Sequence, residues 1–233
     1  MPKTPSQPYR KFYIERLYPL QDQFLSFLTR IREERFYLTG GTALSRFYYH
    51  HRFSEDLDFF SKEELPDFRG CVTEILNAAG KERFSCEAET ASGHFLRCFI
   101  KENDLRLKID FVNEAVYRWG NLKDAPEFSW IDNELNILAN KLAALSRCEV
   151  KDIADIWVLA KHCSFSWREI FEIASKKSPV DPLEVSKIIQ SVPEEELTRV
   201  QWAIDVSTAQ IMTDLNTIAK DILVGNSNTL KIR

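Results

Sequence analysis

The sequence predicts an α+β protein in which every strand lies in the first half of the chain and the second half is helical. Runs with strand character end at Val112, and the apolar patterns after it have helical spacing. Of the 233 residues, 44% are hydrophobic, enough to pack the core of one large domain or two small ones. We therefore expect a boundary between about residues 113 and 130, with a first domain at 10–120 and a helical domain at 121–225.

The chain begins with a proline-rich segment, residues 1–9, that has almost nothing to bury and is expected to be a flexible tail. Apolar residues then recur at helical spacing from about 15 to 34. Aromatic and β-branched residues predict a strand from Phe36 to a turn at Gly40 and Gly41, and Thr42 begins a helix that ends near residue 49. A strand at 56–60 and a helix at 65–79, ended by Gly80, follow.

The next segments predict strands at about 84–89, 95–101 and 105–112, separated by turn signals at 92–93 and 103–104. Helices are then expected at about 133–147, 150–162, 166–175 and 182–190, and from 194 onward into 205–223. Gly225 ends the last helix, and residues 226–233 are expected to be a second flexible tail.

Charge and cysteine usage exclude several classes of protein. Lys and Arg balance Asp and Glu at 17 each over residues 1–113, and they number 14 against 18 in the remainder. Neither half is a basic nucleic-acid platform, so an RNA partner would have to be held by a local patch. The five cysteines lack a Cys-x-x-Cys pair, and the sequence shows neither a signal-peptide pattern nor a long apolar run. We expect a reduced, soluble, cytoplasmic protein with no membrane partner.

The glycine turn is the first candidate binding site. Gly40 and Gly41 are the only adjacent glycines in the sequence. Glycine lets the backbone approach a ligand closely, and Thr42 can cap a helix whose free N–H groups would face a phosphate.

A pair of carboxylates follows about fifteen residues later. Asp56 and Asp58 alternate with Leu57 and Phe59, so a strand would send both carboxylates to one face. Oxygen ligands near substrate phosphates suit Mg²⁺ and phosphoryl transfer. The alternative is a solvated acidic strand end.

A third carboxylate lies on another alternating strand. Asp110 could complete a metal site or take the proton of an attacking hydroxyl. The alternative is an ion pair with Lys108 or Arg106 on the same strand face.

Several polar residues near these carboxylates have two interpretations. Arg52 could neutralise a phosphate and Ser54 could hydrogen-bond one, although a loop arginine is often only a solvated charge. Lys141 interrupts an apolar helical run and must reach either water or an anion. Asp155 follows at a spacing that would share its helix face, but Cys148 marks a joint between the two. The four histidines show no metal-ligand spacing, and we expect structural roles for them.

Together these segments resemble the AbiEii/AbiGii toxin family of the DNA-polymerase-β-type nucleotidyltransferase superfamily. The resemblance covers about residues 30–160 and rests on the order of its motifs. These are GGTAL at 40–44, RFSEDLDFF at 52–60, KIDF at 108–111 and a motif from Lys141 to Asp155. It implies a nucleotidyltransferase fold, with a small mixed sheet flanked by helices and a helical domain that closes the active-site cleft.

The resemblance also implies an activity and its residues. A nucleoside monophosphate would pass from an NTP to a hydroxyl, and pyrophosphate would leave. Mg²⁺ is the implied cofactor, tRNA or another RNA an implied acceptor, and an antitoxin protein an implied partner. Asp56, Asp58 and Asp110 would be the metal ligands and, with Lys141 and Asp155, the catalytic residues. The substrate-binding residues would be Gly40, Gly41, Thr42, Arg52 and Ser54. The alternative is a catalytically silent relative that binds a nucleotide or a protein as a scaffold.

Overall fold

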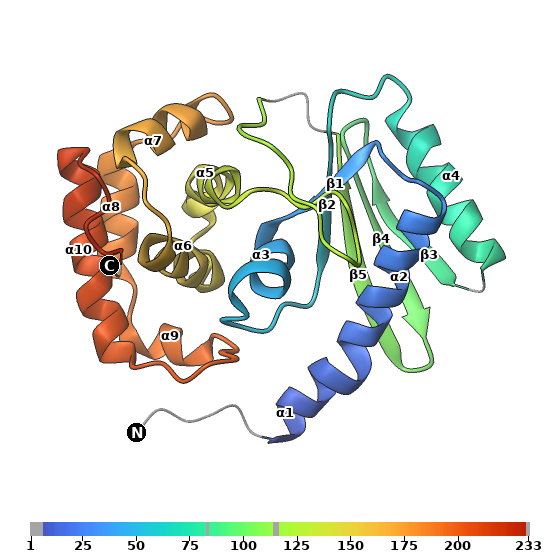
Figure 1. The fold of residues 1–233 in the computed structure, drawn as a ribbon, viewed down its shortest axis with the longest axis horizontal. Coiled ribbons are helices and arrows are strands. Elements are labelled where there is room, and N and C mark those ends of the chain that lie inside the picture. The colour runs from blue at the N-terminus through green and yellow to red at the C-terminus, as the bar shows by residue number, and fades with distance from the viewer. Residues whose placement is uncertain (1–6, 83, 114–116, 232–233) are drawn as a thin grey trace. The chain divides into compact units, whose positions relative to one another are not determined.

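The computed structural model describes residues 7–82, 84–113 and 117–231 (Figure 1). These residues form two compact units. The sheet unit comprises described residues up to 43 and those from 54 to 132, and the helical unit comprises residues 44–53 and those from 133 onward. The chain therefore leaves the sheet unit for ten residues directly after the glycine turn. No local pattern in the sequence predicts this excursion.

The sheet is mixed, as expected. Its strands are β1 (Phe36–Thr39), β2 (Leu57–Ser61), β3 (Ser85–Ala91), β4 (Phe95–Glu102) and β5 (Leu105–Val112). They lie in the order β1-β2-β5-β4-β3, and only the β2–β5 pair is parallel. The α+β prediction is confirmed.

Strand register gathers polar side chains on one face of the sheet. Asp58 pairs with Thr39 on β1 and with Asp110 on β5, and Asp110 pairs in turn with Arg97 on β4. Side chains of register partners lie on the same face of a sheet. We call this side the acidic face, defined by Asp56, Asp58 and Asp110.

The opposite face of the sheet is the aromatic core of the unit. The chain enters through α1 (Gln7–Phe12) and a π-helical turn, η1 (Tyr13–Leu17), which lead into α2 (Tyr18–Arg30). Phe24 on α2 packs against Phe59 on β2 with ring centroids 6.3 Å apart. Phe36 packs in the same way against Phe68 of α4 (Phe68–Lys81), also at 6.3 Å. Figure 1 shows α2 and α4 together on this side of the sheet.

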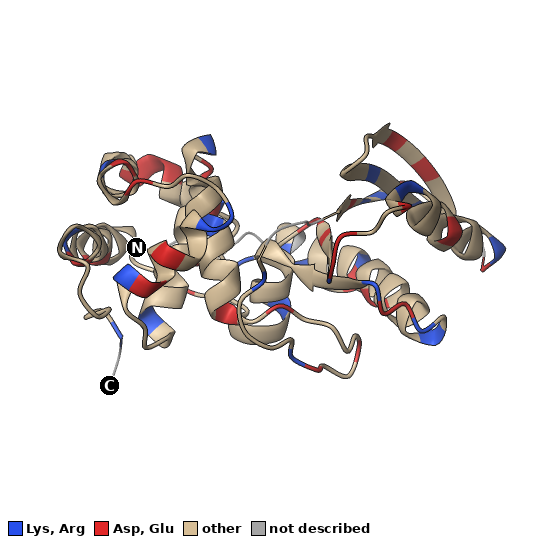
Figure 2. Ribbon diagram, turned by 90° about the horizontal axis from the view of Figure 1, so that it is seen from above, with Lys and Arg blue, Asp and Glu red and all other residues tan. Residues whose placement is uncertain are grey.

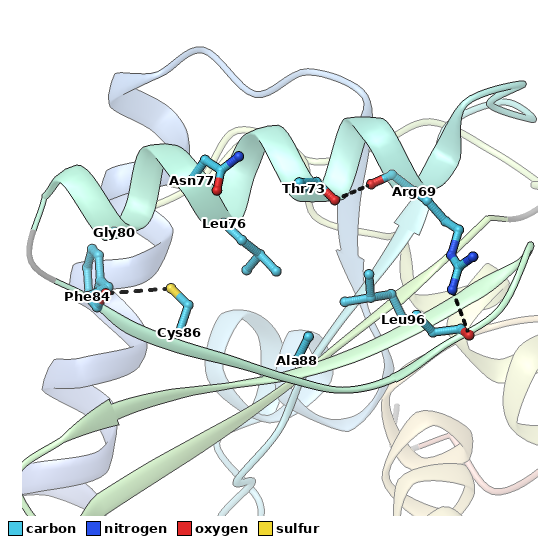
Figure 3. Close-up of a pocket in the computed structure, with 10 residues that line it drawn as sticks. Arg69, Thr73, Leu76, Asn77, Gly80, Phe84, Cys86, Ala88 and Leu96 are labelled. Atoms are coloured by element: carbon cyan, nitrogen blue, oxygen red, sulfur yellow. Dashed lines mark hydrogen bonds between the residues drawn. The ribbon is translucent and has the colours of Figure 1, made fainter.

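Two helix boundaries differ from the predictions. The first helical segment begins at Gln7, well before residue 15 and inside the expected tail, of which residues 1–6 lie outside the described residues. α4 begins only after Asp67, whose Oδ1 caps it by accepting the Gly70 N–H at 3.0 Å. Gly80 does not end α4 as expected, because it keeps a negative φ and the helix continues to Lys81. Figure 3 shows this helix above β3, with Arg69 donating to the Ala91 carbonyl at 3.1 Å.

The helical unit follows the predicted order closely. Its elements are α5 (Glu134–Ala144), η3 (Leu145–Arg147), α6 (Val150–His162), α7 (Trp167–Ser175), α8 (Pro182–Ser191), α9 (Glu194–Arg199) and α10 (Thr208–Val224). Cys148 adopts the left-handed conformation with φ 55°, which separates η3 from α6. The joint expected at Cys148 is confirmed.

A further helix links the two units in sequence. α3 (Gly40–Leu44) continues as the π-helical η2 (Ser45–Tyr49), and His50 ends it in the left-handed conformation. The division between the units falls within this helical stretch, between Ala43 and Leu44.

The boundary near residue 120 is displaced to 132, because the connector returns to the sheet. Leu38 donates its N–H to the Trp130 carbonyl, and Asp132 donates to the Leu38 carbonyl, each at 2.8 Å. These bonds join residues 130–132 to β1.

The described part of the C-terminal segment is held by hydrogen bonds and is not the loose tail expected for 226–233. The Asn228 side chain donates to the Ala160 carbonyl at 2.6 Å, and Thr229 bonds Asp221.

Basic and acidic residues are interspersed over the helices (Figure 2). None of the helices within the described ranges has the length and apolarity needed to cross a membrane.

Candidate active site

The glycine turn lies directly against the acidic face. Gly40 has φ +71°, a conformation that favours glycine, and a Cβ at this position would lie 2.6 Å from Oδ2 of Asp58. Gly41, the second residue of α3, is buried. The structure therefore brings the predicted phosphate-binding turn beside one of the predicted metal ligands.

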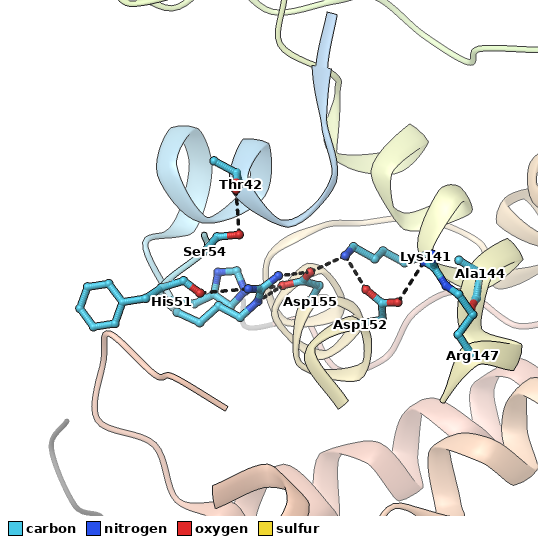
Figure 4. Close-up of polar contacts among 10 residues, drawn as sticks. Thr42, His51, Ser54, Lys141, Ala144, Arg147, Asp152 and Asp155 are labelled. Atoms are coloured by element: carbon cyan, nitrogen blue, oxygen red, sulfur yellow. Dashed lines mark hydrogen bonds and ion pairs between the residues drawn. The ribbon is translucent and has the colours of Figure 1, made fainter. Parts of the chain in front are cut away.

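Thr42 and Ser54 bind each other. The Thr42 hydroxyl lies 2.8 Å from Oγ of Ser54 (Figure 4). It also contacts the Asp56 carbonyl. The Ser54 N–H donates to the Tyr18 hydroxyl at 3.3 Å, and the Gln21 side chain donates to the Ser54 carbonyl at 3.2 Å. These contacts fix the chain that enters β2, so both hydroxyls have a structural role in this arrangement.

Basic side chains engage two of the three carboxylates of the acidic face. Lys108 contacts Asp56 as an ion pair. Arg97 binds Asp110 through both oxygens, with Nε at 2.7 Å from Oδ1 and Nη2 at 2.8 Å from Oδ2. This bidentate bond raises the pKa of the Arg97 guanidinium. The ion pair expected for Asp110 therefore forms with Arg97, and not with Lys108 or Arg106.

The acidic face has the ligand chemistry of a magnesium site. Carboxylate oxygens are the ligands that Mg²⁺ prefers, and register places Asp58 beside Asp110. Within the described ranges, no three or more His, Cys, Asp or Glu side chains are close enough to hold a metal ion. Two of the carboxylates instead contact cations, so metal ligation by these residues stays a prediction.

A buried polar network lies in the helical unit (Figure 4). Asp155 accepts from Arg52 Nε at 2.7 Å and Nη2 at 2.8 Å. His51 Nε2 is 2.8 Å from the same carboxylate. Lys141 Nζ lies 2.7 Å from Asp155 and 2.6 Å from Asp152. We call these residues the Asp155 network.

The charges of the Asp155 network compensate one another. Burial alone would raise the pKa of the Asp155 carboxyl, but Arg52 and Lys141 outweigh it and hold this pKa well below its ordinary value. Burial would lower the pKa of Lys141, yet Asp155 and Asp152 raise it. Burial lowers the pKa of His51 and outweighs the contact with Asp155, which raises it. Because a carboxylate only accepts hydrogen bonds, Nε2 of His51 is the donor to Asp155.

The predicted site residues therefore fall into separate sets. The sheet unit contains Gly40, Gly41, Thr42, Ser54, Asp56, Asp58 and Asp110, and the helical unit contains Arg52, Lys141 and Asp155. Arg52 is 5% exposed and donates to Asp155 and to the Phe53 carbonyl at 3.0 Å. It is thus a buried partner of Asp155 rather than a solvated loop charge.

Sequence reasoning missed His51 and Arg97. His51 directly precedes Arg52, and this adjacency to a predicted site residue was the only signal for it. Arg97 lies between Leu96 and Cys98 along its strand, and this alternation indicates that Arg97 is on the polar face of the sheet. The alternation does not identify Asp110 as its partner. Its pairing with Asp110 depends on strand register.

Comparisons with known proteins agree with this geometry. The model of a family described as nucleotidyl transferase AbiEii toxin, type IV toxin–antitoxin system, matches residues 26–214. The chain is 26% identical over 147 residues to an uncharacterized protein of Aquifex aeolicus, a match that covers 61% of this chain and 66% of that relative, just under two thirds of its length.

Solved structures share the fold. A protein of H. pylori proposed to be a nucleotidyltransferase superposes with a TM-score of 0.59 and 20% identity, covering 87% of this chain and 93% of that one. MenT4, a nucleotidyltransferase toxin of Mycobacterium tuberculosis, has a TM-score of 0.59 and 16% identity, with 89% and 82% covered. The family match spans more than half of the sequence, and the expected glycine turn and carboxylates meet in the fold. The chain therefore belongs to the AbiEii family, which is described as nucleotidyl transferase toxins of type IV toxin–antitoxin systems.

Proposed function

We propose that this nucleotidyltransferase is Mg²⁺-dependent and transfers a nucleoside monophosphate from an NTP to a hydroxyl group of an RNA, with tRNA as the first acceptor to test. The observation that carries the proposal is the approach of Gly40 to Asp58, with Asp110 beside Asp58 in the sheet. A turn for the triphosphate and carboxylates for a metal are the parts that phosphoryl transfer requires.

The reaction exchanges one phosphorus–oxygen bond for another. The acceptor oxygen attacks the α-phosphorus of the NTP, the bond from that phosphorus to the bridging β-phosphate oxygen breaks, and pyrophosphate leaves. The proton of the acceptor hydroxyl passes to a carboxylate of the acidic face. Asp56, Asp58 and Asp110 would hold Mg²⁺, which supplies charge stabilisation at the transferred phosphoryl group when bound.

Residues of the chain orient the reactants. Gly40 and Gly41 would let the backbone approach the triphosphate, because neither has a Cβ. Thr42 and Ser54 hold the turn against the start of β2 through their 2.8 Å contact. In the helical unit, Asp155 holds Lys141 and Arg52 in place, and the contact of these two side chains with phosphate stays a prediction. We further propose control by an antitoxin, which the family description supports, and action in the cytoplasm, as expected from the sequence.

Label transfer tests the proposal. Each of the four NTPs, labelled at the α-phosphate, is incubated with the protein, Mg²⁺ and either total RNA or total cellular protein. Asp58→Ala and the isosteric Asp58→Asn are run beside the wild type. We expect label in an RNA band with the wild type alone, while circular dichroism shows that both variants keep their fold.

Other outcomes decide between the alternatives. Transfer by a folded Asp58→Ala protein contradicts the role of the acidic face. Label in protein alone refutes an RNA acceptor. Absence of both transfer and NTP binding, measured by calorimetry, favours a silent scaffold that binds a partner through its helical unit.

A further inference from the structure

A pocket of about 350 Å³ lies next to the acidic face, within the sheet unit. Asp56 and its partner Lys108 form one wall. Phe12 and Leu17 contribute apolar surface from α1 and η1, and Phe99 lies on β4. The volume is at the lower end of the range of roughly 300–1,000 Å³ that is typical of small-ligand sites. We call this hollow the Phe99 pocket.

The pocket contains a ready platform for a flat ring. The guanidinium carbon of Arg106 lies 3.5 Å from the ring centroid of Phe99, so the two groups stack. The Arg106 side chain is 48% exposed, which leaves much of its surface open to a ligand. Bases of single-stranded RNA stack on aromatic rings and on arginine guanidinium planes.

The charges around the pocket disfavour a polyphosphate. Glu55, Asp56 and Asp104 contribute carboxylates to its lining, against the cations of Arg106 and Lys108. Lys108 pairs with Asp56 and Arg16 pairs with Asp104, so the lining has no excess of cations to hold a triphosphate. A nucleobase is uncharged and can donate exocyclic amino hydrogens to the carboxylates.

The pocket and the glycine turn approach the carboxylates of β2 from opposite sides. Gly40 follows β1 and contacts Asp58, whereas Lys108 and Arg106 lie on β5. β1 and β5 are the neighbours of β2 on its two edges. In phosphoryl transfer the attacking and leaving oxygens lie roughly in line on opposite sides of the phosphorus. If pyrophosphate leaves toward the glycine turn, the attacking hydroxyl arrives from the side of the pocket.

We infer that the Phe99 pocket holds the nucleobase of the RNA nucleotide that carries the attacking hydroxyl. The inference rests on the proposed function and specifies where its acceptor binds. Phe99 and Arg106 stack the base, and this places the hydroxyl of the same nucleotide toward Asp56.

Measuring the KM for acceptor RNA and the KM for the NTP separately tests the assignment. Arg106→Ala removes the outer layer of the platform, and Phe99→Leu removes the ring while retaining apolar bulk. Because each variant removes one layer of the stack beneath the base, we expect the KM for acceptor RNA to rise by roughly tenfold in each variant. The KM for the NTP and its calorimetric Kd should not change.

Arg69→Ala is the matched control. It also removes one exposed arginine from a pocket lining, but that pocket lies between α4 and β3 (Figure 3). A second readout is the anisotropy of a fluorescein-labelled single-stranded RNA pool of random sequence. This readout needs no catalysis, and we expect Arg106→Ala to weaken binding by roughly tenfold relative to Arg69→Ala.

The outcomes separate the inference from the proposed function. Normal transfer with an unchanged acceptor KM in Arg106→Ala and Phe99→Leu overturns the inference alone. A rise in the KM for the NTP assigns the pocket to the NTP base and also overturns it. If the wild type transfers nothing, the proposed function fails, and the anisotropy comparison still decides whether the pocket binds RNA.

Discussion

Gly40 approaches Asp58 so closely that a Cβ on the glycine would lie 2.6 Å from the Oδ2 atom of the aspartate. Cβ atoms in proteins essentially never come within 3.0 Å of a heavy atom outside their own residue and its chain neighbours. The backbone of Gly40 also has φ +71°, which side chains rarely adopt. Both the conformation and the neighbour therefore require glycine at the entrance to the acidic face.

The change Gly40→Ala should cost stability and displace Asp58. The strained φ alone is expected to lower the free energy of unfolding by about 1–3 kcal/mol. Urea denaturation of the two proteins measures the difference. Gly80→Ala is the control, because Gly80 lies inside α4 with no atom within 4 Å of the added Cβ. That change should stabilise the protein by about 0.5–1 kcal/mol, and equal stability of both variants would contradict the requirement for glycine at position 40.

Asp155 should be among the most sensitive positions of the helical unit. Asp155→Asn leaves Arg52 and Lys141 buried without their shared carboxylate, and we expect a loss of about 3–5 kcal/mol in the free energy of unfolding. Glu196→Gln is the matched control because it breaks only the exposed pair with Arg199. It should change stability by less than about 1 kcal/mol. A small effect of Asp155→Asn would refute a structural role for the network.

His51 should make stability depend on pH. Burial lowers its pKa in the folded protein below the ordinary value of 6.5, so the unfolded chain takes up a proton that the folded protein does not. The free energy of unfolding is therefore highest above about pH 6.5, where His51 is neutral in both states. It decreases as the pH falls below this value, because the unfolded chain is then protonated. We expect a decrease on the order of 1 kcal/mol between pH 7.5 and 5.5.

His51→Gln separates this titration from others. Glutamine keeps an N–H donor for Asp155 but does not titrate, so the variant should show a shallower decrease in denaturation midpoint over this pH range. If the denaturation midpoints of the wild type and the variant decreased equally with pH, the pH dependence of stability would belong to groups other than His51.

Local patterns were sufficient to predict most elements of this fold. The alternation in β5 and the helical spacing in α6 predicted both elements with their observed bounds. The motif around Asp56 and Asp58 predicted a shared strand face. Each of these inferences needs only the period of a single strand or helix.

Partners that are distant in sequence were beyond such reasoning. The partner of Asp110 is Arg97, and this pair depends on the register between β4 and β5. The break at Cys148 was expected to interrupt the helix face that Lys141 and Asp155 would share, and the two side chains instead meet at 2.7 Å from two different helices, α5 and α6. The first helical segment also begins at Gln7, where the sequence has no clear local signal.

Lys108 provides a test of the proposed metal site that does not depend on turnover. Its ammonium contacts Asp56, so it should repel a divalent cation bound to the same carboxylate. Lys108→Met removes the charge and keeps most of the apolar stem. We expect Mn²⁺, used as a probe for Mg²⁺, to bind roughly tenfold more tightly, or about 1.4 kcal/mol, in calorimetry.

Lys101→Met is the control, because Lys101 pairs with Glu87 and contacts no carboxylate of the acidic face. Equal affinity in the wild type and Lys108→Met would mean that Asp56 does not ligate the metal, and weaker binding would mean that Lys108 helps to hold the carboxylate in place.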